Sequence, residues 1–137
     1  MIDDATREQL IKAAIAASEN AYIPYSHYPV GAALLAADGT IYTGCNIENA
    51  SYPATICAER TALVKGVSEG VREFAAIAVV TENGGYPCGI CRQMLFEFAP
   101  DLRVIVATTG GTILDERPLS ELLVGGFGPD KLDVHTE

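Results

Sequence analysis

The sequence has no apolar stretch long enough to cross a membrane, because no hydrophobic run reaches the roughly 18 residues that a transmembrane helix needs. It also has no cluster of lysine and arginine. With 18 acidic residues against 9 basic ones, its formal net charge is −9. We therefore expect neither a nucleic-acid partner nor a membrane partner. The first residues, MIDDATREQL, lack the basic-then-apolar pattern of a secretory signal, so a cytoplasmic protein is expected.

Repeats, low-complexity tracts and linkers are also missing from the 137 residues. This length suits one domain, and we expect residues 1–137 to form it. Hydrophobic residues make up 49% of the chain and charged residues 20%, which is ordinary for a globular protein. The four cysteines, without a secretion signal, are interpreted as thiols or metal ligands rather than disulfides.

Hydrophobic spacing predicts helices that alternate with strands. Helices are expected over residues 4–22, 57–66 and 89–98, with a Thr6–Gln9 capping box at the first start and a short helical turn over 119–123. Strands are expected over 30–37, 40–43, 74–80, 102–107 and 113–114, the first two joined by an Asp38-Gly39 turn. Such alternation predicts a three-layer α/β/α sandwich with a mixed sheet of about five strands. The strand–helix–strand crossovers favour parallel neighbours.

Three cysteines carry the strongest functional signal. Cys57 is followed two residues later by Glu59, and 31 positions after Cys57 comes the pair Cys88-x-x-Cys91. Two sulfurs three residues apart can bind one ion, although redox pairs share this spacing. Three protein ligands leave the fourth position of a tetrahedral zinc ion open to water, as in catalytic sites. The alternatives are buried structural thiols or a purely structural zinc site.

Both cysteine motifs lie at expected helix starts, where free N–H groups and the helix dipole stabilise thiolates. Three thiolates on a divalent ion leave a net charge of −1, which opposes the formation of hydroxide. A positive side chain is therefore expected nearby, with Arg60 as the first candidate and Arg92 as the second. Arg60 could instead be a surface ion-pair partner, and Glu59 could be an acid that only complements the helix dipole.

Further segments match a single family in order along nearly the whole chain: AYIPYS (21–26), PVGAAL (29–34), GCNIENASY (44–52), ICAERTA (56–62), PCGICRQ (87–93), and ELL (121–123) before FGP (127–129). Together they resemble the small, homotetrameric, three-cysteine cytidine deaminases. The signature of zinc deaminases includes a glutamate that is not a ligand. The resemblance implies a cytidine deaminase-like catalytic domain with one Zn²⁺ per subunit and active sites at subunit interfaces. It also implies hydrolysis of cytidine and 2′-deoxycytidine to uridine, 2′-deoxyuridine and ammonia in pyrimidine salvage.

The same resemblance assigns roles to individual residues. Glu59 is expected to carry protons from water to ring N3 and to the departing ammonia. The backbone N–H of Ala58 is expected to hold the pyrimidine carbonyl. An extended backbone would aim the side chains of Asn46 and Glu48 to one side. The resemblance implies that both bind the ribose 3′-hydroxyl. Their alternative role is that of ordinary turn residues.

Aromatic residues are expected around the substrate. The resemblance places Tyr28 and Phe127 beside the base, with Phe127 contributed by a neighbouring subunit, and Tyr52 near the same junction and the sugar. Tyr28 and Phe127 could instead be plain core residues. The chain departs from the family where Tyr86 replaces the frequent serine, where 53–55 reads Pro-Ala-Thr, and where Tyr28 replaces the usual phenylalanine. These changes bear on the shape of the pocket rather than on the zinc chemistry.

Other candidate residues and functions are weighed against this prediction. Cys45 is expected to be a small buried residue, since a fourth sulfur ligand would close the reactive position. His27 and His135 lack metal-ligand spacing. Rival enzymes would deaminate another aminopyrimidine, such as blasticidin or a modified nucleoside, or would edit nucleic acid, which the charge and small size disfavour. The non-enzyme alternative is a zinc-stabilised binding or assembly module.

Overall fold

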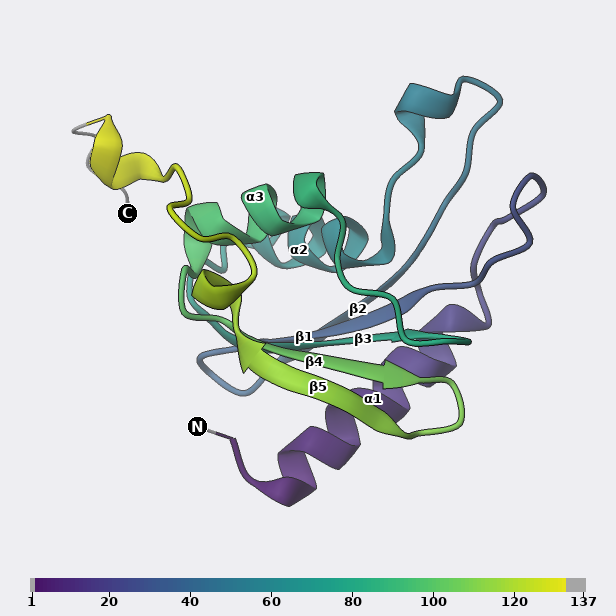
Figure 1. The fold of residues 1–137 in the computed structure, drawn as a ribbon, viewed down its shortest axis with the longest axis horizontal. Coiled ribbons are helices and arrows are strands. Elements are labelled where there is room, and N and C mark those ends of the chain that lie inside the picture. Colours follow the sequence, from purple (N-terminus) through teal and green to yellow (C-terminus); the bar gives the residue numbers. More distant parts are fainter. Residues whose placement is uncertain (1, 133–137) are drawn as a thin grey trace.

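The computed structural model describes residues 2–132, in which one mixed sheet is covered by helices on both faces (Figure 1). The strands are β1 (Gly31–Ala36), β2 (Ile41–Cys45), β3 (Phe74–Thr81), β4 (Arg103–Thr108) and β5 (Ile113–Pro118). Helix α1 (Asp4–Ser18) packs on one face, and α2 (Ala58–Ser68) and α3 (Gly89–Phe98) pack on the other. The three-layer α/β/α sandwich expected from the sequence is confirmed.

The strand order is β2-β1-β3-β4-β5. Among the strands of residues 2–132, β3 and β4 pair in parallel and the other three pairs are antiparallel. The expectation of parallel neighbours is therefore correct for the β3–α3–β4 crossover and wrong for β2–α2–β3. In the latter case β1 lies between the two strands, because the hairpin places it next to β3.

Alternate residues of the central strands face two separate cores, as the two-residue period of a strand requires. Ala33, Ala76 and Ala78 face α1, where these small side chains let the helix approach the sheet. Leu34 and Ile77 face α2 and α3. Burial on both faces explains why these strands are continuously apolar.

Two details of the first helix differ from the prediction. The cap is Asp3, whose Oδ1 accepts a hydrogen bond from the Thr6 N–H at 2.8 Å, so the Thr6–Gln9 capping box is wrong. The helix ends at Ser18 rather than near residue 22. Tyr22 instead pairs with the 46–48 segment, donating its N–H to Asn46 O at 3.0 Å, and this long-range pairing overrides the helical pattern.

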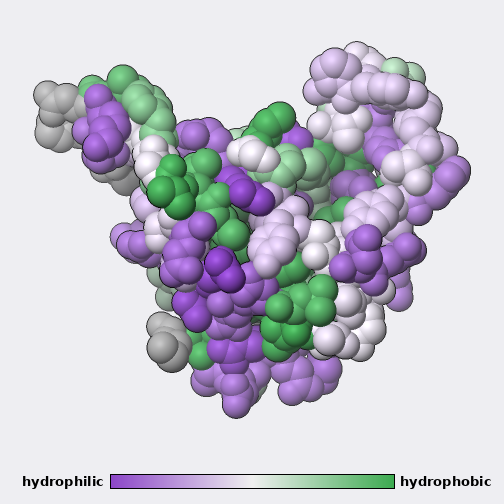
Figure 2. All heavy atoms as spheres, viewed as in Figure 1, coloured by the Kyte–Doolittle hydropathy of each residue, from purple (hydrophilic) through white to green (hydrophobic). Residues whose placement is uncertain are grey.

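Strand β5 extends to Pro118, four residues beyond the expected 113–114. Its later residues, Asp115 to Arg117, are charged and carry no apolar alternation, so the pattern could not reveal them as strand. Within residues 2–132, no helix combines the length and the apolar character that a membrane span requires. Polar and apolar residues are interspersed over the face shown in Figure 2.

Candidate active site

The first turn of α2 lies directly on β2. A Cβ atom at Gly44 would lie 2.4 Å from the carbonyl oxygen of Ala58, so only glycine permits this approach. The Oγ1 atom of Thr61 donates a hydrogen bond to Cys45 O at 3.0 Å and ties the helix to the end of the strand. The sheet thus fixes the position of the helix start that carries two of the predicted site residues.

Three cysteines meet at the two helix starts on this face. Cys57 and Cys88 immediately precede α2 and α3, and Cys91 lies in the first turn of α3. The Sγ atoms of Cys57 and Cys88 are 3.9 Å apart, those of Cys88 and Cys91 are 3.5 Å apart, and all three lie within 4.8 Å of one another. Zn–S bonds of 2.3 Å in a tetrahedron separate sulfurs by about 3.8 Å. The three thiols therefore fit a zinc ion and are not paired in a disulfide.

A guanidinium group stands beside this cluster. The Nη2 atom of Arg60 lies 3.3 Å from the Sγ atom of Cys57. Hydrogen bonding from the Cys91 thiol, reinforced by Arg60, lowers the pKa of Cys57 to about 5. The hydrogen bond to Cys57, together with burial, raises the pKa of Cys91. The cluster therefore favours a thiolate, which is the form that binds a metal.

Glu59 is almost completely buried next to the cysteines, with 4% of its surface exposed. Within residues 2–132, its Oε1 atom has no hydrogen-bond partner. Burial raises the pKa of this carboxyl group to about 7. A buried carboxyl oxygen without a partner is costly, so its retention indicates a group that meets a ligand or water.

A cavity of 180 Å³ opens onto both Glu59 and the cysteines. The structure brings the predicted residues Tyr28 and Asn46 to its wall together with Cys57, Glu59 and Cys88. It is smaller than the roughly 300–1,000 Å³ of pockets for drug-sized ligands, so it suits a single ring. The other lining residues are Val30, Thr55, Ile56, Val79, Thr81, Gly85 and Tyr86.

Thr81 is a lining residue that sequence reasoning did not identify. It is 2% exposed, and its Oγ1 atom accepts hydrogen bonds from the N–H groups of Gly84 and Gly85, both at 2.7 Å. The available signal was a polar residue at the carboxyl end of a buried strand, directly before a glycine turn. Ligands of α/β sheets commonly bind at such strand ends.

Asn46 and Glu48 line two adjacent hollows. The Asn46 amide donates to Tyr28 O at 2.8 Å and accepts from the Val30 N–H at 3.0 Å, so it holds the segment that forms the cavity wall. Glu48 accepts hydrogen bonds from the N–H groups of Tyr25 at 2.9 Å and Ser26 at 3.1 Å. It lines a neighbouring hollow of 330 Å³ with Tyr52, and Thr55 borders both spaces.

Phe127 does not line either hollow. The residue is 55% exposed, and its carbonyl oxygen accepts a hydrogen bond from Gln93 Nε2 at 2.8 Å. Ala58 is fully buried, and its N–H is at the first position of α2, where helices lack an internal acceptor. Arg92 donates to the carbonyl oxygens of Pro87 and Leu122, which makes it a structural residue rather than a partner of the cysteines.

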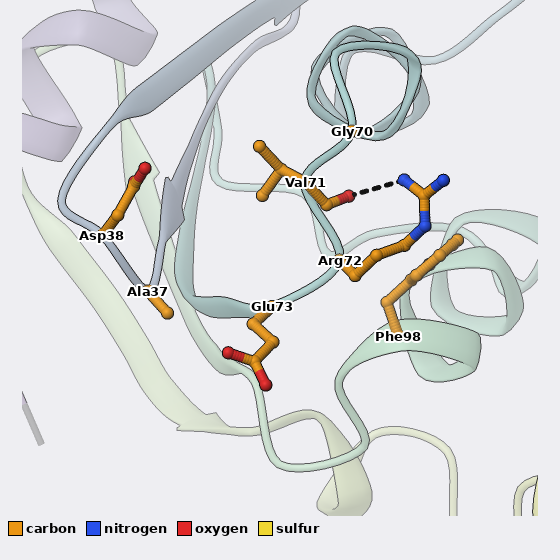
Figure 3. Close-up of a pocket in the computed structure, with 7 residues that line it drawn as sticks. All are labelled: Ala37, Asp38, Gly70, Val71, Arg72, Glu73 and Phe98. Atoms are coloured by element: carbon orange, nitrogen blue, oxygen red, sulfur yellow. Dashed lines mark hydrogen bonds between the residues drawn. The ribbon is translucent and has the colours of Figure 1, made fainter. Parts of the chain in front are cut away.

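Among the described residues, the sulfur cluster includes neither Cys45 nor His27, as expected. Cys45, half-buried at the end of β2, is not among the three grouped sulfurs. His27 occupies a tight turn with φ +57°. His135 lies outside the described residues. A separate hollow, bordered by Arg72 and Phe98 beyond the far end of α2, contains none of the predicted site residues (Figure 3).

Comparison with known proteins agrees with this geometry. Residues 4–108 match the model of the cytidine and deoxycytidylate deaminase zinc-binding region. The chain belongs to this deaminase family. A cytidine deaminase from Sporosarcina psychrophila is 49% identical over 132 residues, covering 95% of this chain and 97% of that protein. One from Halalkalibacterium halodurans is 52% identical over 130 residues, covering 93% and 98%.

The fold agrees as well. The crystal structure of cytidine deaminase from Burkholderia pseudomallei superposes with a TM-score of 0.84 at 46% identity, covering 93% of this chain and 100% of that one. Family membership confirms the expected enzyme class, a zinc-dependent hydrolase. The matched zinc-binding region and the cluster of three sulfurs together confirm zinc as the cofactor.

Proposed function

We propose that this chain catalyses the zinc-dependent hydrolytic deamination of cytidine and 2′-deoxycytidine to uridine or 2′-deoxyuridine and ammonia. One observation carries the proposal. The unpartnered Oε1 atom of buried Glu59 belongs to the same small cavity as Cys57 and Cys88. A structural zinc site needs neither a cavity nor a buried carboxyl group without a partner, so a catalytic site is favoured over an assembly module.

Cys57, Cys88 and Cys91 would hold the zinc ion, which supplies a Lewis acid that activates water. Glu59 accepts a proton from the attacking water and delivers it to ring N3. As the water oxygen bonds to C4 and the C4–N4 bond breaks, Glu59 transfers the second water proton to the leaving nitrogen, which departs as ammonia. The burial of Glu59 favours exchange of protons near neutral pH, as an acid–base group needs.

The two hollows divide recognition between base and sugar. The 180 Å³ cavity takes the pyrimidine ring, with the Ala58 N–H as donor to its carbonyl oxygen. Asn46, on the wall of this cavity, and Glu48, beyond Thr55, bind the ribose 3′-hydroxyl. Hydrogen bonding from Ser26 holds the pKa of Glu48 below its usual value, so the group stays an acceptor at neutral pH. A nucleoside is therefore preferred over free cytosine, which would leave these groups unpaired.

We infer a homotetramer in which neighbouring subunits complete the cavity. Support comes from exposed apolar side chains near the site and in the C-terminal segment, namely Tyr52, Ile90, Val124 and Phe127. The absence of Phe127 from the cavity wall of its own chain supports a role in the site of a neighbouring subunit. Light scattering is expected to give four subunits, whereas a fully active monomer would contradict the assignment. The free thiols and the acidic charge favour a cytoplasmic enzyme without a nucleic-acid partner.

A panel of substrates tests the reaction. The purified zinc-loaded protein should convert cytidine and 2′-deoxycytidine with the absorbance change of uracil formation, and it should convert free cytosine much less efficiently. Blasticidin and a cytidine-containing oligonucleotide complete the panel. Turnover of either compound without turnover of the two nucleosides would assign a rival substrate, and inactivity on all of them would favour the assembly module.

A further inference from the structure

Tyr86 forms part of the wall of the cavity immediately before the Pro87-Cys88 sequence. It lines the same 180 Å³ space as Glu59 and Cys88, while 47% of the residue is exposed to solvent. Tyr86 is therefore a residue at the rim of the cavity. A flexible aromatic ring in this position would move aside for a larger ligand. The contacts that restrain the ring therefore determine whether it limits the size of the ligand.

The Tyr86 ring is held at its hydroxyl end. The hydroxyl group donates a hydrogen bond to the Oδ2 atom of Asp115 on β5. Asp115 is itself fixed, because Oδ2 accepts from Arg117 Nε at 2.8 Å and Oδ1 accepts from the Glu116 N–H at 2.8 Å. Hydrogen bonds from Tyr86 and Arg117 keep the pKa of Asp115 below its usual value, so the acceptor is charged at neutral pH.

The backbone that carries Tyr86 is also fixed. Gly84 has φ +79°, and a Cβ atom there would lie 2.0 Å from Leu114 Cδ1, so β5 packs directly against this turn. Thr81 Oγ1 holds the N–H groups of Gly84 and Gly85 from the opposite side. The turn cannot retreat from the cavity without displacing the edge strand.

We propose that Tyr86, held in place by Asp115, is a specificity-determining residue that limits the size of substituents on N4 and C5 of the pyrimidine. The inference rests on the proposed function, because a base that presents C4 to Glu59 and the cysteines also brings N4 and C5, which are bonded to C4 and can carry substituents, close to these residues. Tyr86 lines the cavity and lies two residues before Cys88, and we therefore place such substituents against it. The sugar extends toward Asn46 and Glu48 and does not contact Tyr86 in this arrangement.

The test compares kcat/KM for N4-methylcytidine and 5-methylcytidine with kcat/KM for cytidine. In the Tyr86→Ala variant, at least one of these ratios should rise by roughly tenfold or more, which is the discrimination that one methyl group commonly produces. The ratio of 2′-deoxycytidine to cytidine should stay unchanged, since the ribose lies elsewhere. Unchanged ratios for both methylated substrates in the folded, zinc-loaded variant would overturn the proposal. If the alanine variant does not fold, the same kcat/KM ratios measured for Tyr86→Leu test the proposal.

The role of Asp115 is tested by a double-mutant cycle. Tyr86→Phe and Asp115→Asn should each raise the same ratio, and the double variant should raise it no further than either single change. Asp101→Asn, which alters an exposed carboxylate away from this contact, should leave the ratio near the wild-type value. Additive effects would contradict the holding role. A wild-type protein inactive on cytidine would refute the proposed function, whereas active enzymes with equal ratios would refute only this inference.

Discussion

The Nη2 atom of Arg60 lies 3.3 Å from the Sγ atom of Cys57, within hydrogen-bond distance of a thiolate. The two residues are three positions apart, at the end of α2 where the N–H groups point outward. Three thiolates around a divalent ion carry a net charge of −1, and this guanidinium is a positive group in direct contact with one of them. We infer that Arg60 offsets a charge that would otherwise weaken the activation of water.

Replacement of Arg60 should therefore reduce the rate rather than remove the metal. We expect Arg60→Gln to retain about one zinc per chain while kcat on cytidine falls roughly 10–100-fold, the usual cost of losing a partner of a metal ligand. Lys65→Gln removes one positive charge from an exposed position on the same helix and should leave kcat near wild type. Equal kcat values for both variants and wild type would show that the Arg60 contact has no catalytic effect.

Mutation should distinguish the cysteines that bind zinc from Cys45, which does not. Cys88→Ser should lose zinc and activity together, because a hydroxyl group is a poor replacement for a thiolate ligand. Cys45→Ala should keep both, since Cys45 lies outside the sulfur cluster. Measurement of the zinc content and the cytidine deaminase activity of both variants tests these expectations. Zinc retained in Cys88→Ser, or lost in Cys45→Ala, would require a different ligand set.

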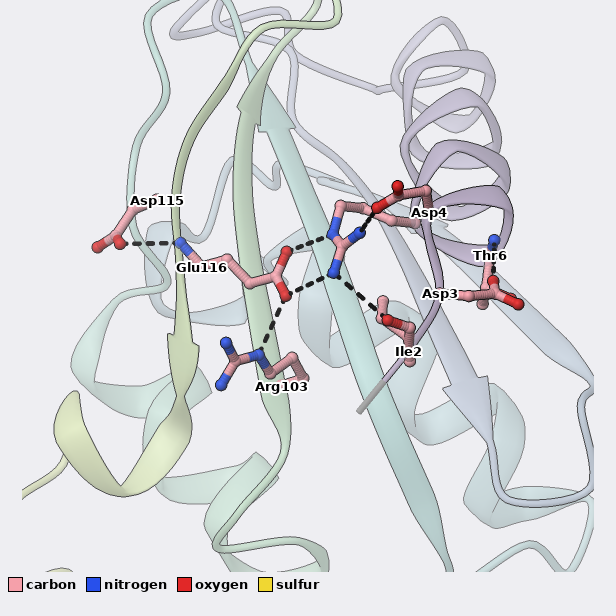
Figure 4. Close-up of polar contacts among 8 residues, drawn as sticks. Ile2, Asp3, Asp4, Thr6, Arg103, Asp115 and Glu116 are labelled. Atoms are coloured by element: carbon pink, nitrogen blue, oxygen red, sulfur yellow. Dashed lines mark hydrogen bonds and ion pairs between the residues drawn. The ribbon is translucent and has the colours of Figure 1, made fainter.

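Stability against acid should depend on Glu116, which joins α1 to the edge of the sheet (Figure 4). Its Oε2 atom accepts from Arg7 Nη2 at 3.0 Å and from Arg103 Nε at 3.1 Å. Hydrogen bonding from Arg7, followed by that from Arg103, holds the pKa of Glu116 below its usual 4.5. A lowered pKa in the folded state stabilises the protein above about pH 4.5, and this stabilisation is lost as the pH falls through the folded pKa.

We expect Glu116→Gln to lower the free energy of unfolding at pH 7 by about 1–2 kcal/mol. The difference from wild type should shrink below pH 4.5, as the wild-type carboxylate becomes protonated. Urea unfolding at fixed zinc and protein concentrations, at pH 7 and pH 3.5, measures both values. Glu97→Gln, at an exposed position on α3, serves as the matched control. A difference that grows toward low pH would contradict the assignment.

Local patterns account for the parts of the fold and site that the sequence could predict. The spacing of Cys57, Glu59, Cys88 and Cys91 is contained in two short helix starts, so the grouping of their side chains follows once those helices share a face. The buried strands were recognisable because each is a short, continuous apolar run. The family resemblance supplied what spacing alone could not, namely the reaction and its substrate.

Contacts between distant segments could not be predicted in this way. Glu48 lines a different hollow from Asn46, and its carboxylate accepts from the N–H groups of Tyr25 and Ser26, which belong to a segment whose path was not known. The hydrogen bond between Tyr86 and Asp115 joins residues 29 positions apart. It forms only because β5 continues through charged residues that carry no strand pattern.

The central claim is that Glu59 moves protons at a zinc site which the three cysteines hold without it. The rate of cytidine deamination by zinc-loaded Glu59→Gln, measured beside wild type, tests this most directly, because glutamine keeps the shape of the side chain and removes its acid–base chemistry. We expect the zinc content to match wild type and kcat to fall by roughly 10²–10⁴-fold or more. A variant with full zinc and most of the wild-type rate would contradict the account.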